Sequence, residues 1–168
     1  MNQAHFHLVV NHLPIIFPIV GLLILIGGII FRSEIIKRAA YFIFIIGSLS
    51  ALVAMNSGEG AEEIAENLPG VTDSIIHEHE EAAELFASVG YLLGAVSLLA
   101  LWANWMKKGF SSILSYVVLL ISLVIIILGK QAGTTGGEIR HTEIRTVNAA
   151  GNTIDTISTN ESEEGDDD

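Results

Sequence analysis

Four hydrophobic runs without a single charged residue constrain the fold of this chain more than any other feature. Each run is long enough to cross a hydrocarbon core of ~30 Å as a helix rising about 1.5 Å per residue. A segment that crosses lipid must satisfy its own backbone hydrogen bonds, and none of the runs shows the alternation of a membrane strand. The runs occupy residues 13–31, 39–57, 85–106 and 109–129. The sequence therefore predicts an all-α membrane protein, a bundle of four transmembrane helices.

The pattern predicts one four-helix transmembrane domain over residues 1–145 and an acidic, disordered tail over residues 146–168. Glutamates recur at helical spacing from residue 59, which predicts a short amphipathic helix over 59–68, in the loop after the second run. Alternation over residues 138–145 predicts a short strand. Asn11 is expected to cap the first helix. The four transmembrane helices are expected at about 12–31, 39–57, 74–106 and 110–129.

Basic residues set the expected orientation. Five of the eight Lys and Arg residues lie in the two short loops that follow the first and third runs, and none lies in residues 1–13 or 58–84. By the positive-inside rule these two loops face the cytoplasm, which places both termini on the extracytoplasmic side. Trp102 and Trp105 stand where an aromatic belt at the cytoplasmic interface is expected. The five basic residues are Arg32, Lys37, Arg38, Lys107 and Lys108.

Composition excludes several classes of function. The net charge of −11 comes mainly from the tail and from residues 59–84, and no basic stripe exists, so nucleic-acid binding is not expected. The chain has no cysteine, which rules out disulfides, thiolate metal sites, iron–sulfur clusters and covalently attached c-type haem. Any haem bound by this chain would therefore be haem b, held without covalent bonds.

Nearly all six histidines fall at one end of the expected bundle. His7 and His12 lie at the start of the first run, and His79 precedes the third. Imidazole is the commonest metal ligand and a standard axial ligand of haem. We expect His12 and His79 to bind haem b, or His7, His12, His79 and Glu59 to bind zinc or copper. A second interpretation is that these are polar residues of the interface that only hydrogen-bond to neighbouring helix ends.

Further residues are weaker candidates for the same site. Glu62 and Glu80 are expected to orient a ligating imidazole by accepting its other N–H. Arg140 and His141 follow the fourth run at the same end of the bundle.

Helical periodicity gives the two histidines before the third run opposite directions. At 100° per residue, His79 shares a face with Phe86 and Gly90, whereas His77 turns to the other side. We therefore expect His79 to point into the bundle and His77 to point to water. Gly90 and Gly94 form a pair of small residues suited to close helix contact.

Four short motifs resemble, in the same order, a family of uncharacterised four-helix bacterial membrane proteins, catalogued as domain of unknown function twenty-two thirty-one. The first is His-x4-His-x-Pro-Ile over residues 7–15. The others are Ser-Gly-Glu-Gly-Ala-Glu at 57–62, His-Glu-Glu-Ala at 79–82 and Gly-Gly-Glu-Ile at 136–139. The resemblance spans residues 7 to about 141.

The resemblance implies a four-helix domain in the bacterial inner membrane whose motif residues collect on one face. Similar domains are in some bacteria fused to c-type cytochrome modules, which points to a redox setting. The chain departs from the family at Asn11, where an apolar residue is more usual, and at Arg140 and His141, where an aliphatic-aromatic pair is commoner.

Two functions follow as expectations. The first is an accessory or electron-transfer subunit of a membrane complex, with the cofactor at the extracytoplasmic end and other membrane or periplasmic proteins as partners. The second is an assembly or scaffold subunit, in which the cluster is structural or docks a partner. A transporter is disfavoured because no ionisable residue lies in the middle of any run. No nucleophile–base pair or phosphate loop is present, so enzymatic activity is not favoured.

Overall fold

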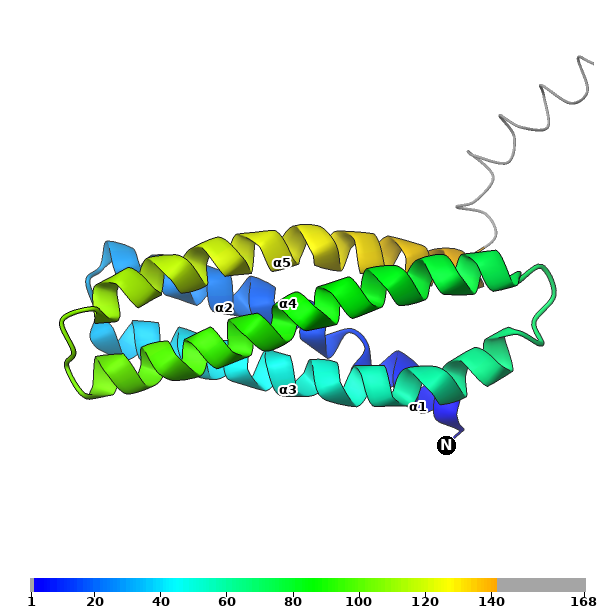
Figure 1. Ribbon diagram of the computed structural model, residues 1–168, viewed down its shortest axis with the longest axis horizontal. Coiled ribbons are helices and arrows are strands. Elements are labelled where there is room, and N and C mark those ends of the chain that lie inside the picture. The colour runs from blue at the N-terminus through cyan, green and yellow to red at the C-terminus, as the bar shows by residue number, and fades with distance from the viewer. Residues whose placement is uncertain (1, 142–168) are drawn as a thin grey trace, which may run out of the picture.

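The computed structural model describes residues 2–141 (Figure 1). Every regular element within these residues is a helix, and four stretches are long and apolar enough to cross a membrane. These findings confirm the predicted all-α fold of four long apolar helices. The acidic tail predicted over residues 146–168 lies outside the described residues. The helices are α1 (Gln3–Val10), α2 (Leu13–Ile30), α3 (Glu34–Ala65), α4 (Asp73–Trp105) and α5 (Ser111–Arg140).

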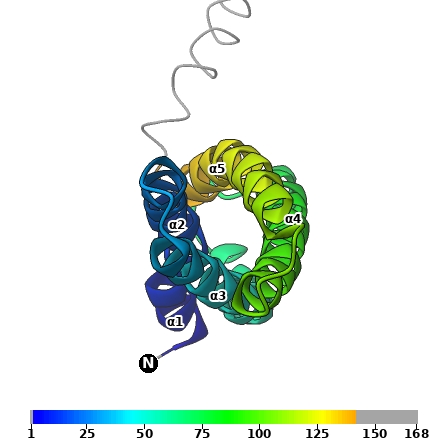
Figure 2. The ribbon, with the colours of Figure 1, turned by 90° about the vertical axis from the view of Figure 1, so that its left-hand side faces the viewer.

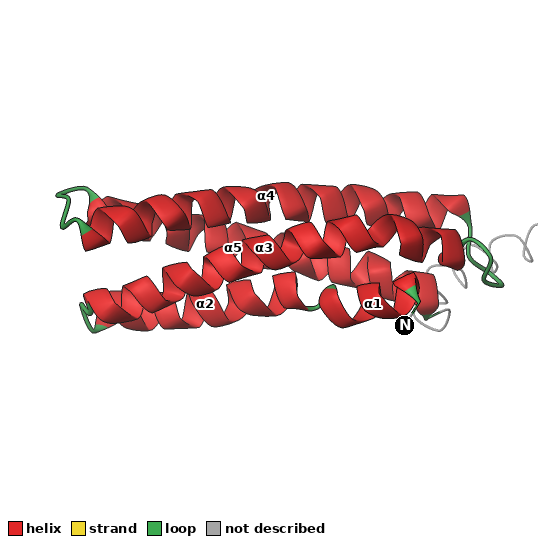
Figure 3. Ribbon diagram, turned by 90° about the horizontal axis from the view of Figure 1, so that it is seen from below, coloured by secondary structure: helices red, strands yellow, loops and turns green. Residues whose placement is uncertain are grey.

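Helices α2 to α5 form an up-and-down ring, in which each helix packs on its neighbour in the chain and α5 closes the ring by packing on α2 (Figure 2). Helix α1 packs against α3 (Figure 3). The start of α1 and the end of α5 lie at the same end of the bundle (Figure 1). We call this the histidine end, because it carries His7 and His79. The opposite end, with turns at Arg32 and Lys107, is the basic end.

The first membrane-length stretch is broken just before the predicted helix start at about residue 12, and the short helix that precedes the break was not predicted. Helix α1 ends at Val10 and α2 begins at Leu13. Pro14 explains the break, because its ring lacks an N–H and would clash with the carbonyl of Val10 in an unbroken helix. Asn11 does not cap α2: its Oδ1 is buried without a hydrogen-bond partner, and His12 takes the N-cap position with no side-chain hydrogen bond to the helix.

Two helices run further than predicted. Helix α3 continues through Gly58 and Gly60 to Ala65, so most of the expected separate amphipathic helix over 59–68 is the last part of α3. Helix α5 continues past Gly129 to Arg140, so residues 138–140 are helical and not the start of a strand. A glycine costs a helix only about 1 kcal/mol. Packing of these segments on neighbouring helices outweighs that cost.

The core of the bundle combines a few large side chains with glycines that allow close approach. Tyr41, Phe44 and Leu93 are almost completely buried. A Cβ at Gly94 would lie 2.4 Å from the Cβ of Ser48 on α3, as expected from the predicted pair of small residues. Many other large apolar side chains are exposed on the outer faces of the helices, which suits a lipid environment.

The two turns at the basic end have the same backbone geometry. Arg32 and Lys107 adopt φ values of 51° and 52°, in the left-handed region that normally favours glycine. In each turn the next residue donates its N–H to a carbonyl five residues back: Ser33 to Gly28 and Lys108 to Ala103, both at 2.9 Å. These are Schellman helix ends with a basic residue at the left-handed position.

The contact at Gly94 gives a test of the bundle. Replacing Gly94 with Ala should lower the free energy of unfolding by about 1–3 kcal/mol, because the new methyl group would overlap Ser48. The matched control is Gly27→Ala, at a position with nothing within 4 Å of the added Cβ, which should leave stability unchanged or raise it by up to ~1 kcal/mol. Thermal unfolding in detergent micelles measures both. Equal effects of the two variants would contradict this packing.

Candidate functional site

His7 is held between α1 and α3 by a hydroxyl group. Its Nδ1 lies 2.9 Å from the Oγ of Ser57. Ser57 uses its single proton to donate to the carbonyl oxygen of Ala54, at 2.8 Å. Because that proton is committed, the Ser57 oxygen must accept from the imidazole. We infer that His7 carries its proton on Nδ1.

His79 repeats this arrangement between α4 and α5. Its Nδ1 lies 3.1 Å from the Oγ1 of Thr135. The Thr135 hydroxyl is directed to the carbonyls of Gln131 and Ala132, each at 3.2 Å, so its oxygen accepts from the ring. Gly136 leaves the space that the ring occupies, since a Cβ there would lie 2.9 Å from Cε1 of His79.

The two imidazoles therefore form a matched pair at the histidine end. Both are partly buried, and they lie within electrostatic range of each other. A neutral imidazole protonated on Nδ1 has its lone pair on Nε2, and that is the atom that ligates metals. A metal-binding histidine usually has its other nitrogen fixed by a hydrogen bond of this kind. This geometry leaves a lone pair on Nε2 of each ring, which can bind a metal ion or accept a hydrogen bond.

The other predicted ligands lie differently. His12 is exposed, and its Nδ1 lies 3.2 Å from the carbonyl oxygen of Leu8 in α1. Glu59 is exposed on α3. Arg140 and His141 are exposed at the end of α5, where the N–H of His141 donates to Gly137. Among residues 2–141, no group of three or more His, Asp or Glu side chains is arranged to hold a metal ion. The structure thus does not bring His7, His12, Glu59 and His79 together as one such group.

The helical-wheel prediction for α4 is confirmed. His79 reaches Thr135 on α5, whereas the side chain of His77 is 72% exposed and lies near Glu80 and Glu81. Glu62 and Glu80, the predicted orienting carboxylates, lie near one another on α3 and α4. Ser57 and Thr135 instead hold the two imidazoles.

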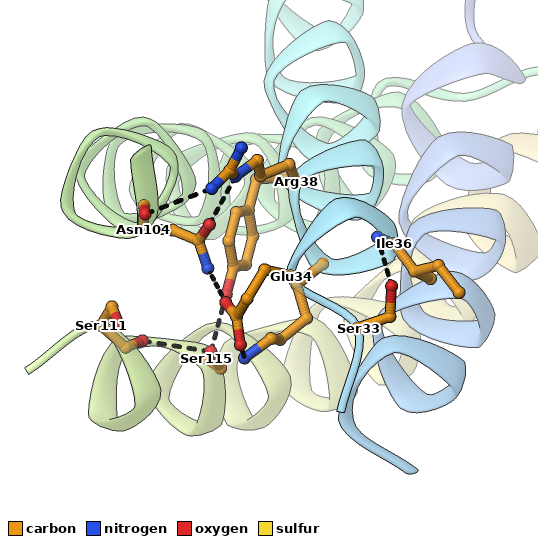
Figure 4. Close-up of polar contacts among 9 residues, drawn as sticks. Ser33, Glu34, Ile36, Arg38, Asn104, Ser111 and Ser115 are labelled. Carbon is orange, nitrogen blue, oxygen red and sulfur yellow. Dashed lines mark hydrogen bonds and ion pairs between the residues drawn. The ribbon is translucent and has the colours of Figure 1, made fainter. Parts of the chain in front are cut away.

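Sequence reasoning missed a second polar cluster, at the basic end (Figure 4). At its centre is Asn104 of α4, a residue that is 3% exposed and whose side-chain oxygen accepts from Nε of Arg38 at 2.6 Å. Its amide nitrogen donates to the Glu34 carboxylate at the start of α3. Glu34 also pairs with Nζ of Lys37 at 2.6 Å. The network therefore ties together α3 and α4.

Two further contacts extend the basic-end cluster to α2 and α5. Tyr41 hydrogen-bonds to Ser115 of α5 across 2.7 Å in the buried core. Lys37, only 7% exposed, lies against Gly28 of α2, where a Cβ would come within 2.8 Å of Cγ of the lysine. The spacing of Glu34 to Lys37 and Arg38, three and four residues on, is the sequence signal for part of this cluster.

Comparisons with known proteins give no relative: no protein-family model, curated protein or solved structure matches this chain. The resemblance to domain of unknown function twenty-two thirty-one stays a prediction from the four motifs.

Asn104 gives a test of the basic-end cluster. Asn104→Ala should lower the free energy of unfolding by about 1–3 kcal/mol, because it removes the partner of both Arg38 and Glu34 at a buried position. The control is Asn67→Ala, which removes an exposed amide that bonds only within its own segment, to the carbonyl of Glu63. Urea or thermal unfolding in micelles compares the two. A loss for Asn104→Ala no greater than that for Asn67→Ala would contradict a structural role for the cluster.

Proposed function

We propose that this chain is a non-enzymatic subunit of a bacterial inner-membrane complex and binds a transition-metal ion through Nε2 of His7 and His79. The observation that carries the proposal is the shared hydrogen bonding of the two imidazoles. Each ring has its Nδ1–H held by a hydroxyl whose own proton is committed to a backbone carbonyl. This arrangement fixes the tautomer that ligates a metal and orients the ring, as second-shell partners do in metal sites.

The charge at the histidine end favours a cation. Residues 58–84 contain nine acidic side chains and no Lys or Arg. Glu62 of α3 lies near Glu80 of α4, the residue that follows His79 in the sequence. A negative surface raises the local concentration of cations. The acidic side chains therefore supply the negative potential that would attract a metal cation to this end of the bundle.

Two imidazoles alone suit some metals better than others. Zinc sites commonly use three or four protein ligands, whereas cuprous copper would accept two imidazoles. We therefore propose Cu(I) as the best-matched ion, with Zn(II) completed by water or by a partner as the weaker fit.

The geometry supports haem b less well than it supports a bare metal ion. A macrocycle needs a wide cavity beside its axial ligand. The apolar space inside the bundle, bounded by residues such as Phe44 and Phe86, is too narrow to hold even a water molecule, and a groove lies between α1 and α3. Neither is lined by His12 or His79. A bare ion, which needs no such cavity, is the closer match.

The proposed orientation places the histidine end outside the cytoplasm. The basic end has Arg32, Lys107 and Lys108 exposed, as the positive-inside rule expects of a cytoplasmic face. Trp105 is 70% exposed there, and Nζ of Lys108 lies 5.6 Å from the ring centre of Trp102. Aromatic and basic side chains at this depth are typical of the membrane interface.

Metal titration of the purified protein tests the proposed function. We expect one Cu(I) per chain in competition with a chromogenic chelator, and at least a hundredfold weaker binding after His7→Ala or His79→Ala. The controls are His5→Ala and His77→Ala, which remove exposed imidazoles. A wild-type protein that binds neither Cu(I) nor Zn(II), or variants that bind as tightly as the wild type, would overturn the proposal.

The hydroxyl groups and the pH give a second, independent test. Ser57→Ala and Thr135→Ala should each weaken metal binding about 10–100-fold, because each frees a ring from the bond that orients it. Binding should also weaken as the pH is lowered, since a proton then competes with the metal ion for Nε2. Isothermal titration across pH 5.5–8 measures both effects. Binding that is independent of pH over this range would argue against imidazole ligands.

A further inference from the structure

A groove runs between α1 and α3 at the histidine end, with a volume of about 810 Å³. Its wall on α3 is one face of that helix, where Leu52, Asn56, Glu59 and Glu63 recur at helical spacing. The whole lining consists of Asn2, Gln3, Phe6, Leu52, Val53, Asn56, Ser57, Glu59, Gly60 and Glu63. The groove lies outside the ring of α2 to α5, on the side where α1 packs.

The groove changes character along its length. Towards the middle of the bundle its walls are apolar, and Phe6, Leu52 and Val53 are 40%, 44% and 45% exposed. Towards the end of α3 its walls carry the carboxylates of Glu59 and Glu63. An elongated ligand with an apolar tail and a polar head matches this gradient.

The α1 wall of the groove is fixed by close packing. An added Cβ at Gly60 would fall within 2.9 Å of three side-chain atoms of Gln3, so α1 meets α3 at a residue that has no side chain. Asn2 caps α1 by accepting from the N–H of His5 at 2.8 Å. The groove is therefore bounded by two helices in contact and is not a gap between loose segments.

The charge of the lining selects the head group. Two carboxylates stand at the polar end, the amides of Asn2, Gln3 and Asn56 offer further hydrogen bonds, and none of the lining residues is Lys or Arg. A primary ammonium has three N–H donors and a positive charge. The two carboxylates would accept its hydrogen bonds and attract its charge. An anionic head group would be repelled.

We propose that this groove binds an aminophospholipid of the surrounding bilayer, with its ammonium group between Glu59 and Glu63 and an acyl chain along Leu52 and Val53. The inference rests on the membrane location given under the proposed function, but not on metal binding. Charge disfavours the chain's own segment 142–168 as the occupant, because its sequence has one basic residue, Arg145, among many acidic ones. A second copy's histidine end is disfavoured for the same reason.

Lipid retention tests the groove. The purified protein is equilibrated in nanodiscs of equal parts phosphatidylethanolamine and phosphatidylglycerol and then released into a mild detergent. Native mass spectrometry measures the mass of the protein together with any lipid that it retains. We expect one retained phosphatidylethanolamine per chain. Glu59→Gln/Glu63→Gln should reduce this retention about tenfold. The matched control, Glu78→Gln/Glu84→Gln, removes two exposed carboxylates from α4 and should retain the lipid.

A second variant separates steric from electrostatic effects. Val53→Trp fills the apolar part of the groove without a change of charge and should also release the lipid. Equal retention of the two lipids by the wild type, or undiminished retention of phosphatidylethanolamine by both groove variants, would overturn the proposal. Copper titration of Val53→Trp, which keeps every charge, should match the wild type, and failure of the protein to enter nanodiscs would instead count against the membrane location.

Discussion

The structure depends on polar contacts between helices at the two ends of the bundle. In lipid, apolar helices gain little from burying one another, so small residues and interhelical hydrogen bonds must hold them together. At the histidine end, His7 joins α1 to α3 and His79 joins α4 to α5. At the basic end, Asn104 joins α4 to Arg38 and Glu34 of α3. Between these layers the contacts are apolar or involve glycine and serine, as at Gly94.

The two ends of the bundle differ in whether their polar side chains keep an atom that can bind a ligand. At the basic end, Asn104 hydrogen-bonds to Arg38 and Glu34 at once, and Glu34 also pairs with Lys37, so each charged group of the cluster has a partner. This pairing favours a structural role for the basic-end cluster, because its charged side chains already have partners within the protein. At the histidine end each ring donates its Nδ1–H to a neutral hydroxyl and keeps a lone pair on Nε2. This difference leads us to propose metal binding at the histidine end alone.

Sequence patterns predicted the number of long helices and the inward direction of His79, because both follow from spacing along one chain segment. Helix α1 and the continuation of α3 through Gly58 and Gly60 were not predicted, because local signals compete there with packing. The hydroxyl partners of the histidines lie 50 and 56 residues away along the chain, on helices whose rotation no single-helix pattern reveals. For the same reason Asn104 could not be recognised as the centre of a cluster.

The tautomers of His7 and His79 test the central claim most directly. Nitrogen-15 NMR of histidine-labelled protein in micelles at pH 8, assigned with single His→Gln variants, distinguishes a protonated from an unprotonated ring nitrogen. The account predicts that both residues are held with the proton on Nδ1 and the lone pair on Nε2, and that the exposed His5 and His77 exchange freely between tautomers. A proton on Nε2 of His7 or His79, or free exchange like that of the exposed rings, would contradict it.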